Sequence, residues 1–263
     1  MRILRIIQLV VFDLLHYLIS LPFLPILYFQ AKRIRKEVPM LPEAIEPNGI
    51  AYSTNQNEKE ISILALGEST MAGVGVTFHK DGLVGTFAKE WAHLNRTSVS
   101  WSVYARSGYT AQKVHQKLIP KIEKSNFDII IISLGANDAF KLKNVISWQK
   151  DIQKLIHTLR SLYPNATIAF FNMPPIQEFS AFSFLMKFII GKKVNILGRG
   201  LFEIAKMPNV FYFRDKITLD TWVLKMNKKY KESDFFSDGI HPSKLTYQTW
   251  AKEMALFLFE KLN

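Results

Sequence analysis

The sequence predicts an α/β fold in which a sheet of five parallel strands is covered by helices on both faces. Short apolar runs of strand length alternate with longer stretches of helical character along residues 59–263. One of these runs, FDIIIISL (127–134), is continuously apolar and rich in β-branched residues, which is typical of a strand buried on both faces. Polar, glycine-containing segments follow several of the runs, as expected where loops gather at the carboxyl edge of a parallel sheet.

The predicted elements follow one another without an internal repeat. Five strands are predicted, at 61–66, 99–105, 127–134, 166–173 and 209–213. Helical sequence follows the first strand through residue 94, and further helices are predicted at 111–124 with a kink or boundary at Pro120, at about 148–162, and at 245–262.

A Phe-, Ile- and Leu-rich stretch at 179–202 lies between the last two strands and is interrupted by a basic GKK sequence. Two interpretations are open for it. One is a further pair of helices that cover the sheet. The other is a lid, or a second membrane-contacting surface, beside the functional site.

The first 36 residues differ from the rest of the chain. The run from Ile6 to Phe29 is nearly all apolar and is long enough to span a bilayer. The sequence YFQAKRIRK follows it, without the small residues of a signal-peptide cleavage site, so we expect an uncleaved membrane-associating segment. Pro22 and Pro25 interrupt the run, and each would kink or stop a helix.

Two geometries fit this membrane segment. At 100° per residue, Arg5, Asp13, His16 and Ser20 fall on one narrow stripe of a helix. The segment is either a single anchor helix or a helix–break–helix element that dips into one leaflet and returns. Positive charge flanks both ends, so the positive-inside rule gives no orientation and the side of the membrane stays open. A helix buried in a soluble fold fits the basic flanks less well.

Residues 37–58 contain three prolines and a polar tail, which is typical of a linker. The sequence therefore predicts three parts: a membrane anchor or re-entrant hydrophobic segment at 1–36, a linker at 37–58, and an α/β domain at 59–263. No feature of the sequence indicates an oligomeric state.

The net charge of the chain indicates which kinds of partner it attracts. The formal net charge is +12, and six basic residues against one acidic residue lie in positions 1–36. Because there is no zinc-ligand pattern and no RNA-binding motif, and because the basic clusters flank apolar segments, we expect attraction to anionic lipid and no nucleic-acid partner. The absence of cysteine excludes disulfides and thiolate metal sites.

Polar residues that suit one kind of chemistry follow the predicted strands. Ser69 follows the first strand, Gly108 the second and Asn137 the third, while Asp238 and His241 precede the last helix. The carboxyl ends of parallel strands meet at one edge of a sheet. A serine, a histidine, a carboxylate and amide donors at one place are the groups needed for acyl transfer through a covalent intermediate.

Each of these residues alone has a plainer interpretation. Ser69 could be a helix cap, Gly108 a turn glycine, and Asn137 a partner of loop backbone groups. The histidines at 16, 79, 93, 115 and 157 lack a carboxylate in equivalent spacing at a strand edge, apart from the Asp13/His16 pair of the membrane segment. The combination and its order are therefore much more specific than any one residue.

Two other sequence motifs are each excluded by a single residue. The Gly67–Gly73 spacing is similar to a phosphate-binding loop, but Val74 stands where that loop has lysine. The G-x-S-x-G elbow needs glycine at the position of Met71. No cluster of metal ligands is present in the sequence, so we expect neither a metal nor another cofactor.

The four stretches LGEST, SGYT, LGAND and DGIHP resemble the four sequence blocks of the SGNH hydrolases, also called the GDSL esterase/lipase family. The resemblance covers about residues 60–263 in the family's block order. It implies a flavodoxin-like three-layer α/β/α sandwich with five parallel strands. It also implies that Ser69 is the nucleophile, His241 the general base and Asp238 its orienting carboxylate, with an oxyanion hole formed by Ser69 N–H, Gly108 N–H and the Asn137 side chain.

The sequence departs from the family pattern at two places. Glu68 stands where the first block usually has aspartate, which changes a supporting residue by one methylene. The asparagine common upstream of Gly108 is absent, and the sequence there is SVYARSG. Arg106 in this stretch is either a contact for an anionic substrate group or a surface charge.

The resemblance implies a serine ester hydrolase that forms an acyl-Ser69 intermediate. The membrane segment and the 179–202 stretch favour lipid esters, while the fold equally serves short-acyl esters. Two alternatives stay open: an acyltransferase or O-deacetylase acting on a carbohydrate, and a non-catalytic, membrane-tethered binding protein with the same fold.

Overall fold

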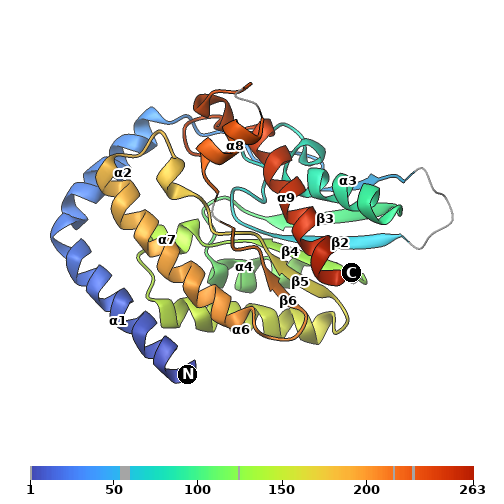
Figure 1. The fold of residues 1–263 in the computed structure, drawn as a ribbon, viewed down its shortest axis with the longest axis horizontal. Helices are drawn as coiled ribbons and strands as arrows, with labels where there is room; N and C mark the ends of the chain where they lie inside the picture. Colours follow the sequence, from blue (N-terminus) through green and yellow to red (C-terminus); the bar gives the residue numbers. More distant parts are fainter. Residues whose placement is uncertain (1, 54–59, 124, 216, 227–228) are drawn as a thin grey trace.

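The computed structural model describes residues 2–53, 60–123, 125–215, 217–226 and 229–263. In these residues a six-stranded sheet of order β1-β3-β2-β4-β5-β6 lies between two layers of helices (Figure 1). The predicted α/β sandwich is confirmed, with one strand more than the sequence indicated.

Five strands run parallel and match the five predicted apolar runs: β2 (Ile61–Gly67), β3 (Val99–Ala105), β4 (Ile129–Ser133), β5 (Thr167–Phe170) and β6 (Val210–Tyr212). They are buried because alternate residues face opposite helix layers. In β2, Leu64 and Leu66 join the core on one face, and Ile63 and Ala65 join the core on the other.

The sixth strand, β1 (Asn48–Ala51), pairs antiparallel with the edge of β3. It lies in the segment predicted to be a linker, whose residues 54–58 fall outside the described part of the chain. Its glycine explains why the sequence resembles a loop: a Cβ at Gly49 would lie 2.1 Å from the ring of Trp101, so the close pairing requires glycine.

The two helix layers pack against separate hydrophobic cores, one on each face of the sheet. The helices α4 (Ala111–Lys117), α6 (Val145–Leu162) and α7 (Phe184–Ile204) cover one face, and α3 (Leu83–Asn95), α8 (Leu219–Lys225) and α9 (Lys244–Leu262) cover the other. A short helix α5 (Ala136–Phe140) follows β4. Single 3₁₀ turns lie at η1 (Leu21–Phe23), η2 (His79–Asp81), η3 (Ile119–Lys121), η4 (Ile176–Glu178) and η5 (Glu232–Phe235).

Two predicted helices differ in detail. The helix expected after the first strand begins only at Leu83, because turns and η2 occupy the sequence before it. The 179–202 stretch contains one long helix, α7, and not a pair. Its buried face includes Ile189, Val194 and Leu197, so it covers the sheet as the first interpretation proposed.

The N-terminal segment forms α1 (Arg2–Ser20) and α2 (Leu24–Glu37), separated by the turn η1 at Pro22. The run Leu4–Glu37 is long and apolar enough to cross a membrane by length and composition. In Figure 1 the two helices curve along the side of the molecule next to α7, with α1 beside it.

The polar stripe of α1 faces the protein. Asp13 forms an ion pair with Lys193 of α7, and its other carboxylate oxygen accepts a 2.7 Å hydrogen bond from the N–H of Val145, the first residue of α6. His16 contacts the carbonyl of Ile189 at 2.9 Å. Three helices therefore meet at one buried carboxylate, which acts on α6 in the way that acidic groups stabilise helix N-termini.

We expect Asp13→Ala to lower the free energy of unfolding by about 3–5 kcal/mol, because the Lys193 side chain, 1% exposed, would lose its counter-ion. Urea denaturation measures this change. The matched control is the double variant Asp13→Leu with Lys193→Met, which removes both charges and should recover most of the loss. Equal stability of Asp13→Ala and the native protein would contradict the role of the pair.

Candidate active site

The register of the sheet aligns the loops that carry the predicted site. Gly67 at the end of β2 pairs with Ala105 at the end of β3 and with Ser133 at the end of β4. The three following loops therefore begin at the same level. Ser69, Gly108, Asn137 and His241 line one cavity of about 490 Å³, so the structure brings together residues that lie far apart in the sequence.

Ser69 lies on a tight turn that follows β2. The carbonyl of Glu68 accepts from the N–H of Ala72 at 2.8 Å, and the carbonyl of Ser69 accepts from the N–H of Val74 at 3.1 Å. Residues 69–75 form turns and no helix starts there, so Ser69 is not the helix cap that one interpretation allowed. The turn starts so sharply because Gly67 has no side chain: a Cβ there would lie 2.4 Å from the Ser133 carbonyl.

The Ser69 turn packs directly against the loop that carries the histidine. The hydroxyl of Tyr247 on α9 donates to the carbonyl of Val74 at 2.7 Å, and the hydroxyl of Ser237 donates to the carbonyl of Gly75 at 3.2 Å. These contacts fix the serine turn relative to residues 237–242, which form a small loop closed by a bridge between Phe236 and Pro242.

Asp238 and His241 form a pair within that loop. One carboxylate oxygen of Asp238 accepts from the N–H groups of Ile240 at 2.9 Å and His241 at 2.7 Å, and the other lies 2.7 Å from His241 Nδ1. Although burial raises the pKa of Asp238, the hydrogen bonds from His241 outweigh it and hold this pKa below its usual value. An ionised carboxylate at this distance accepts a hydrogen bond from Nδ1–H, an arrangement in which Nε2 is the ring nitrogen that can accept a proton.

Two backbone N–H groups at the cavity are free donors. Among the described residues, neither the N–H of Ser69 nor that of Gly108 has a hydrogen-bond acceptor. Gly108 has a φ of +79°, while a Cβ there would meet nothing within 4 Å. Its backbone conformation, and not a lack of space, therefore favours glycine at this position.

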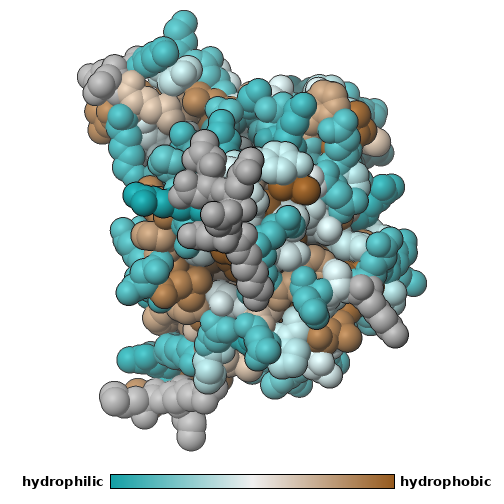
Figure 2. Space-filling model, turned by 90° about the vertical axis from the view of Figure 1, so that its right-hand side faces the viewer, coloured by the Kyte–Doolittle hydropathy of each residue, from teal (hydrophilic) through white to brown (hydrophobic). Residues whose placement is uncertain are grey.

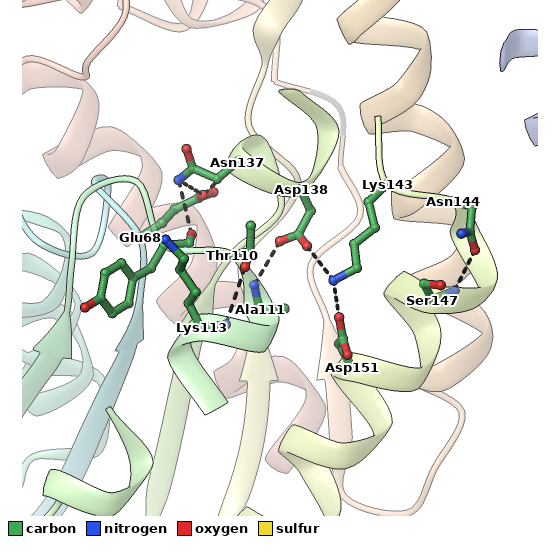
Figure 3. Close-up of polar contacts among 11 residues, drawn as sticks. Glu68, Thr110, Ala111, Lys113, Asn137, Asp138, Lys143, Asn144, Ser147 and Asp151 are labelled. Atoms are coloured by element: carbon green, nitrogen blue, oxygen red, sulfur yellow. Dashed lines mark hydrogen bonds and ion pairs between the residues drawn. The ribbon is translucent and has the colours of Figure 1, made fainter. Parts of the chain in front are cut away.

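The side chain of Asn137 is engaged elsewhere. Its amide nitrogen donates to Oε2 of Glu68 and, at 3.2 Å, to the carbonyl of Tyr109 (Figure 3). An asparagine amide has two N–H bonds, so both are used. Asn137 can donate to a ligand in the cavity only by giving up one of these contacts, and the longer one to Tyr109 is the weaker.

Glu68 connects the loops after β2 and β4. Its carboxylate is buried and accepts from the N–H groups of Ala136 at 2.8 Å and Asn137 at 3.0 Å, in addition to the Asn137 side chain. Burial raises the pKa of Glu68 to about 7, although the hydrogen bonds from Asn137 and Ala136 oppose this rise. The longer side chain of glutamate thus reaches both the backbone and the amide group of Asn137.

Asp138 links the third loop to the second. One of its oxygens accepts from the N–H of Ala111 at 2.9 Å, at the start of α4, and the other lies 3.3 Å from Nζ of Lys143 (Figure 3). Lys143 is also paired with Asp151 of α6. The sequence offered no signal for this network except the position of Asp138 directly after Asn137.

Arg106 does not line the cavity. Its guanidinium forms a 3.0 Å ion pair with Glu43, whose other oxygen accepts from the N–H of Ser107 at 2.7 Å. The structure therefore favours a structural surface charge for Arg106. Glu43 belongs to the 37–58 segment, where no motif pointed to a residue of this kind.

The remaining wall of the cavity is mainly apolar. It includes Ala31, Ile34 and Arg35 of α2, which the sequence did not connect with the site. Large apolar side chains from several loops and from α5, α7, α8 and α9 complete it: Phe140, Phe179, Phe182, Met186, Ile217, Leu219, Trp222, Phe236, Ile240 and Trp250. The cavity thus combines one polar corner with space for a hydrocarbon group.

A protein-family model matches the larger part of the chain. The family model described as GDSL-like lipase/acylhydrolase matches residues 65–249. No curated protein sequence matches the chain.

Solved structures share the fold at low sequence identity. A psychrotrophic esterase, EstA, from Pseudoalteromonas sp. is 18% identical with a TM-score of 0.53, and the match covers 76% of this chain and 97% of that one. A lipase/acylhydrolase from Enterococcus faecalis is 18% identical with a TM-score of 0.53 and coverages of 76% and 96%. A putative GDSL-like lipase from Parabacteroides merdae is 16% identical with a TM-score of 0.60 and coverages of 77% and 97%.

The raised pKa of Glu68 predicts a pH-dependent stability. Between pH 4.5 and about 7 the folded protein keeps a proton on Glu68 that the unfolded chain releases. The contribution of this group is therefore complete below pH 4.5 and is lost as the pH rises towards 7.

Relative to Glu68→Gln, we expect the native protein to lose up to about 3 kcal/mol of unfolding free energy over this range. Urea denaturation at several pH values measures the difference. Glu260→Gln, which removes an exposed carboxyl group near the end of α9, is the control. A difference that stays constant, or that grows in favour of the native protein with rising pH, would contradict the prediction.

Proposed function

Because the chain belongs to the GDSL-like lipase/acylhydrolase family, a family of carboxylic ester hydrolases, we propose that it cleaves esters through an acyl intermediate on Ser69. Its substrates are lipid or short-acyl esters at a membrane surface. The observation that carries the proposal is the 2.7 Å contact between Asp238 and His241 Nδ1 in a loop packed against the Ser69 turn, with Ser69 and His241 lining one cavity.

In the first half of the reaction, Nε2 of His241 takes the proton of the Ser69 hydroxyl, and the serine oxygen attacks the ester carbonyl. Asp238 holds the imidazole in the tautomer that leaves Nε2 unprotonated and stabilises the imidazolium that forms. His241 then gives the proton to the leaving alcohol, which breaks the ester bond and leaves the acyl group on Ser69.

The negative charge on the carbonyl oxygen needs donors. The free N–H groups of Ser69 and Gly108 supply two of them. Asn137 supplies the third when its amide exchanges the 3.2 Å contact with the Tyr109 carbonyl for the oxyanion. Glu68 retains the other N–H of the amide and so keeps it oriented. A donor of this kind contributes roughly 10²–10³-fold to the rate.

In the second half, a water molecule replaces the alcohol. His241 takes a proton from this water, its oxygen attacks the acyl carbonyl, and the bond to Ser69 breaks as the serine oxygen regains a proton. The apolar wall of the cavity suits the acyl part of the substrate, because it offers hydrocarbon contacts next to the polar corner.

We expect Ser69→Ala to lower ester hydrolysis by about 10⁶-fold and to abolish labelling by a fluorophosphonate probe, since the nucleophile is absent. Nitrophenyl ester hydrolysis and in-gel fluorescence measure the two effects. The control is Ser107→Ala, which removes a neighbouring hydroxyl of the same cavity and should retain labelling. Labelling of Ser69→Ala at the native level would refute the assignment.

We expect Asp238→Asn to lower kcat by up to roughly 10⁴-fold, because an asparagine amide no longer imposes the productive tautomer on His241. Steady-state kinetics across pH measure this, and circular dichroism tests whether the variant is folded. Asp220→Asn, at an exposed carboxylate in the first turn of α8, is the control. A folded Asp238→Asn variant with native kcat would exclude the orienting role.

A further inference from the structure

The first helix has its polarity reversed relative to a surface helix of a soluble domain. Its stripe of Leu9, Asp13, His16 and Ser20 is buried against the protein, while large apolar side chains point outward. The exposed set continues through η1 and into α2, and Phe184 and Phe188 on α7 are exposed as well. Figure 2, which views the molecule from the side opposite α2, shows a surface where apolar residues are scattered among hydrophilic ones.

The polar contacts of α1 exclude a spanning helix while it is docked. A helix that crossed the bilayer would carry Asp13 into hydrocarbon or leave Lys193 and the start of α6 without their partner. It would also draw its neighbour α7 into the membrane, together with the basic residues Lys187 and Lys192. An orientation in the membrane plane avoids both costs, because only the outward face of α1 then meets lipid.

A groove between α1 and α7 has the chemistry of a lipid site. It has a volume of about 440 Å³ and is lined by apolar side chains of both helices, including Phe12 and Phe188. Two cations stand at it: Lys192, whose ammonium lies 4.0 Å from the Phe188 ring centroid, and Arg199, whose guanidinium lies 5.8 Å from the Phe12 ring centroid. Hydrocarbon contacts beside cations match an acyl chain next to a phosphate group.

We propose that α1, η1 and α2 lie in the plane of one leaflet of an anionic bilayer, held to the protein by Asp13, with Lys192 and Arg199 contacting lipid phosphate. The basic end of α2, at Lys32, Arg33, Arg35 and Lys36, stays at the same headgroup level. Both ends of the segment are therefore on one side of the membrane.

This orientation indicates that the substrate comes from the leaflet, an inference that rests on the proposed ester hydrolysis. The helix α2 carries exposed apolar residues such as Phe29 on one side and contributes Ala31, Ile34 and Arg35 to the wall of the cavity on the other. The helix α2 thus contacts the leaflet on one side and the cavity on the other. An ester-bearing lipid can reach Ser69 along α2, with Arg35 placed to meet an anionic headgroup.

The test uses the full chain with vesicles of phosphatidylcholine alone or mixed with phosphatidylglycerol. The double variant Leu14→Glu with Leu18→Glu places charge on side chains that are 58% and 55% exposed on the outward face of α1. We expect at least a tenfold loss of vesicle co-flotation. Leu256→Glu, at a 50% exposed leucine of α9, is the matched control and should bind as the native chain does.

A second variant separates the phosphate contacts from the apolar ones. The double variant Lys192→Glu with Arg199→Glu should reduce binding to the phosphatidylglycerol vesicles more than binding to phosphatidylcholine alone. Added salt should likewise weaken the binding of the native chain more on the phosphatidylglycerol vesicles. Both lipids carry a phosphate and differ in net headgroup charge, so an equal loss on both vesicle types would exclude a selective contact of these two residues with anionic lipid.

The chain has no cysteine, so a single thiol can be introduced at either end of the segment. Labelling of this thiol then tests on which side of the membrane that end lies. With Arg5→Cys or Lys36→Cys protein bound to preformed vesicles, a membrane-impermeant maleimide should label both variants without detergent. Protection of the Arg5→Cys thiol alone would show a spanning helix and overturn the proposal.

Activity assays keep the two proposals distinct. The Leu14/Leu18 variant should hydrolyse a soluble short-chain nitrophenyl ester at the native rate and lose at least tenfold on a long-chain ester embedded in vesicles. If the native chain lacks ester hydrolysis but floats with vesicles as described, only the proposed function fails. If native and variant bind vesicles equally, or if native chains instead form dimers that the variant dissociates and do not bind vesicles, the membrane docking is refuted.

Discussion

The buried carboxylate of Glu68 is the contact on which the geometry of the site depends. It lies next to Ser69 in the chain and accepts hydrogen bonds from the backbone and side chain of Asn137. The loop with the proposed nucleophile, Ser69, and the loop with the proposed oxyanion donor, Asn137, are thus tied through one side chain. Burial of this group is costly, and its three hydrogen-bond donors offset much of that cost.

On one side of the sheet, carboxylates accept hydrogen bonds from the first N–H groups of several helices. Glu68 accepts from the first N–H groups of α5, Asp138 from the first N–H of α4, and Asp13 from the first N–H of α6. Each carboxylate comes from a different element than the helix it meets. Helix N-termini favour negative charge, so these contacts both stabilise the helices and fix the positions of the loops that precede them.

The sequence predicted what depends on local pattern. The β-branched run at 129–133 could form only a buried strand, and the spacing of Asp238 and His241 fits a pair made within one loop. Long-range pairing was not predictable. The strand β1 is short and contains a glycine needed only because Trp101 lies beside it, and the ion pair of Glu43 with Arg106 joins residues 63 positions apart.

The polar stripe of α1 was visible in the sequence, while its partners were not. Lys193 lies 180 positions from Asp13, within a GKK sequence that also resembles a solvent-exposed cluster. The contribution of α2 to the cavity was hidden for the same reason, since nothing in an apolar helix shows which neighbour it will cover. On a soluble domain the polar side chains of a surface helix face outward and its apolar side chains face inward. In α1 this arrangement is reversed, because its buried carboxylate has partners on α6 and α7.

The docking of α1 also limits how the protein can be shortened. An apolar N-terminal segment is commonly removed to obtain a soluble catalytic domain for crystallisation. Here such a truncation before residue 37 would strip the carboxylate from Lys193, uncover the start of α6 and open the side of the cavity that α2 closes. The segment that resembles a removable tail is a structural part of the enzyme, and detergent rather than deletion is the rational route to a well-behaved preparation.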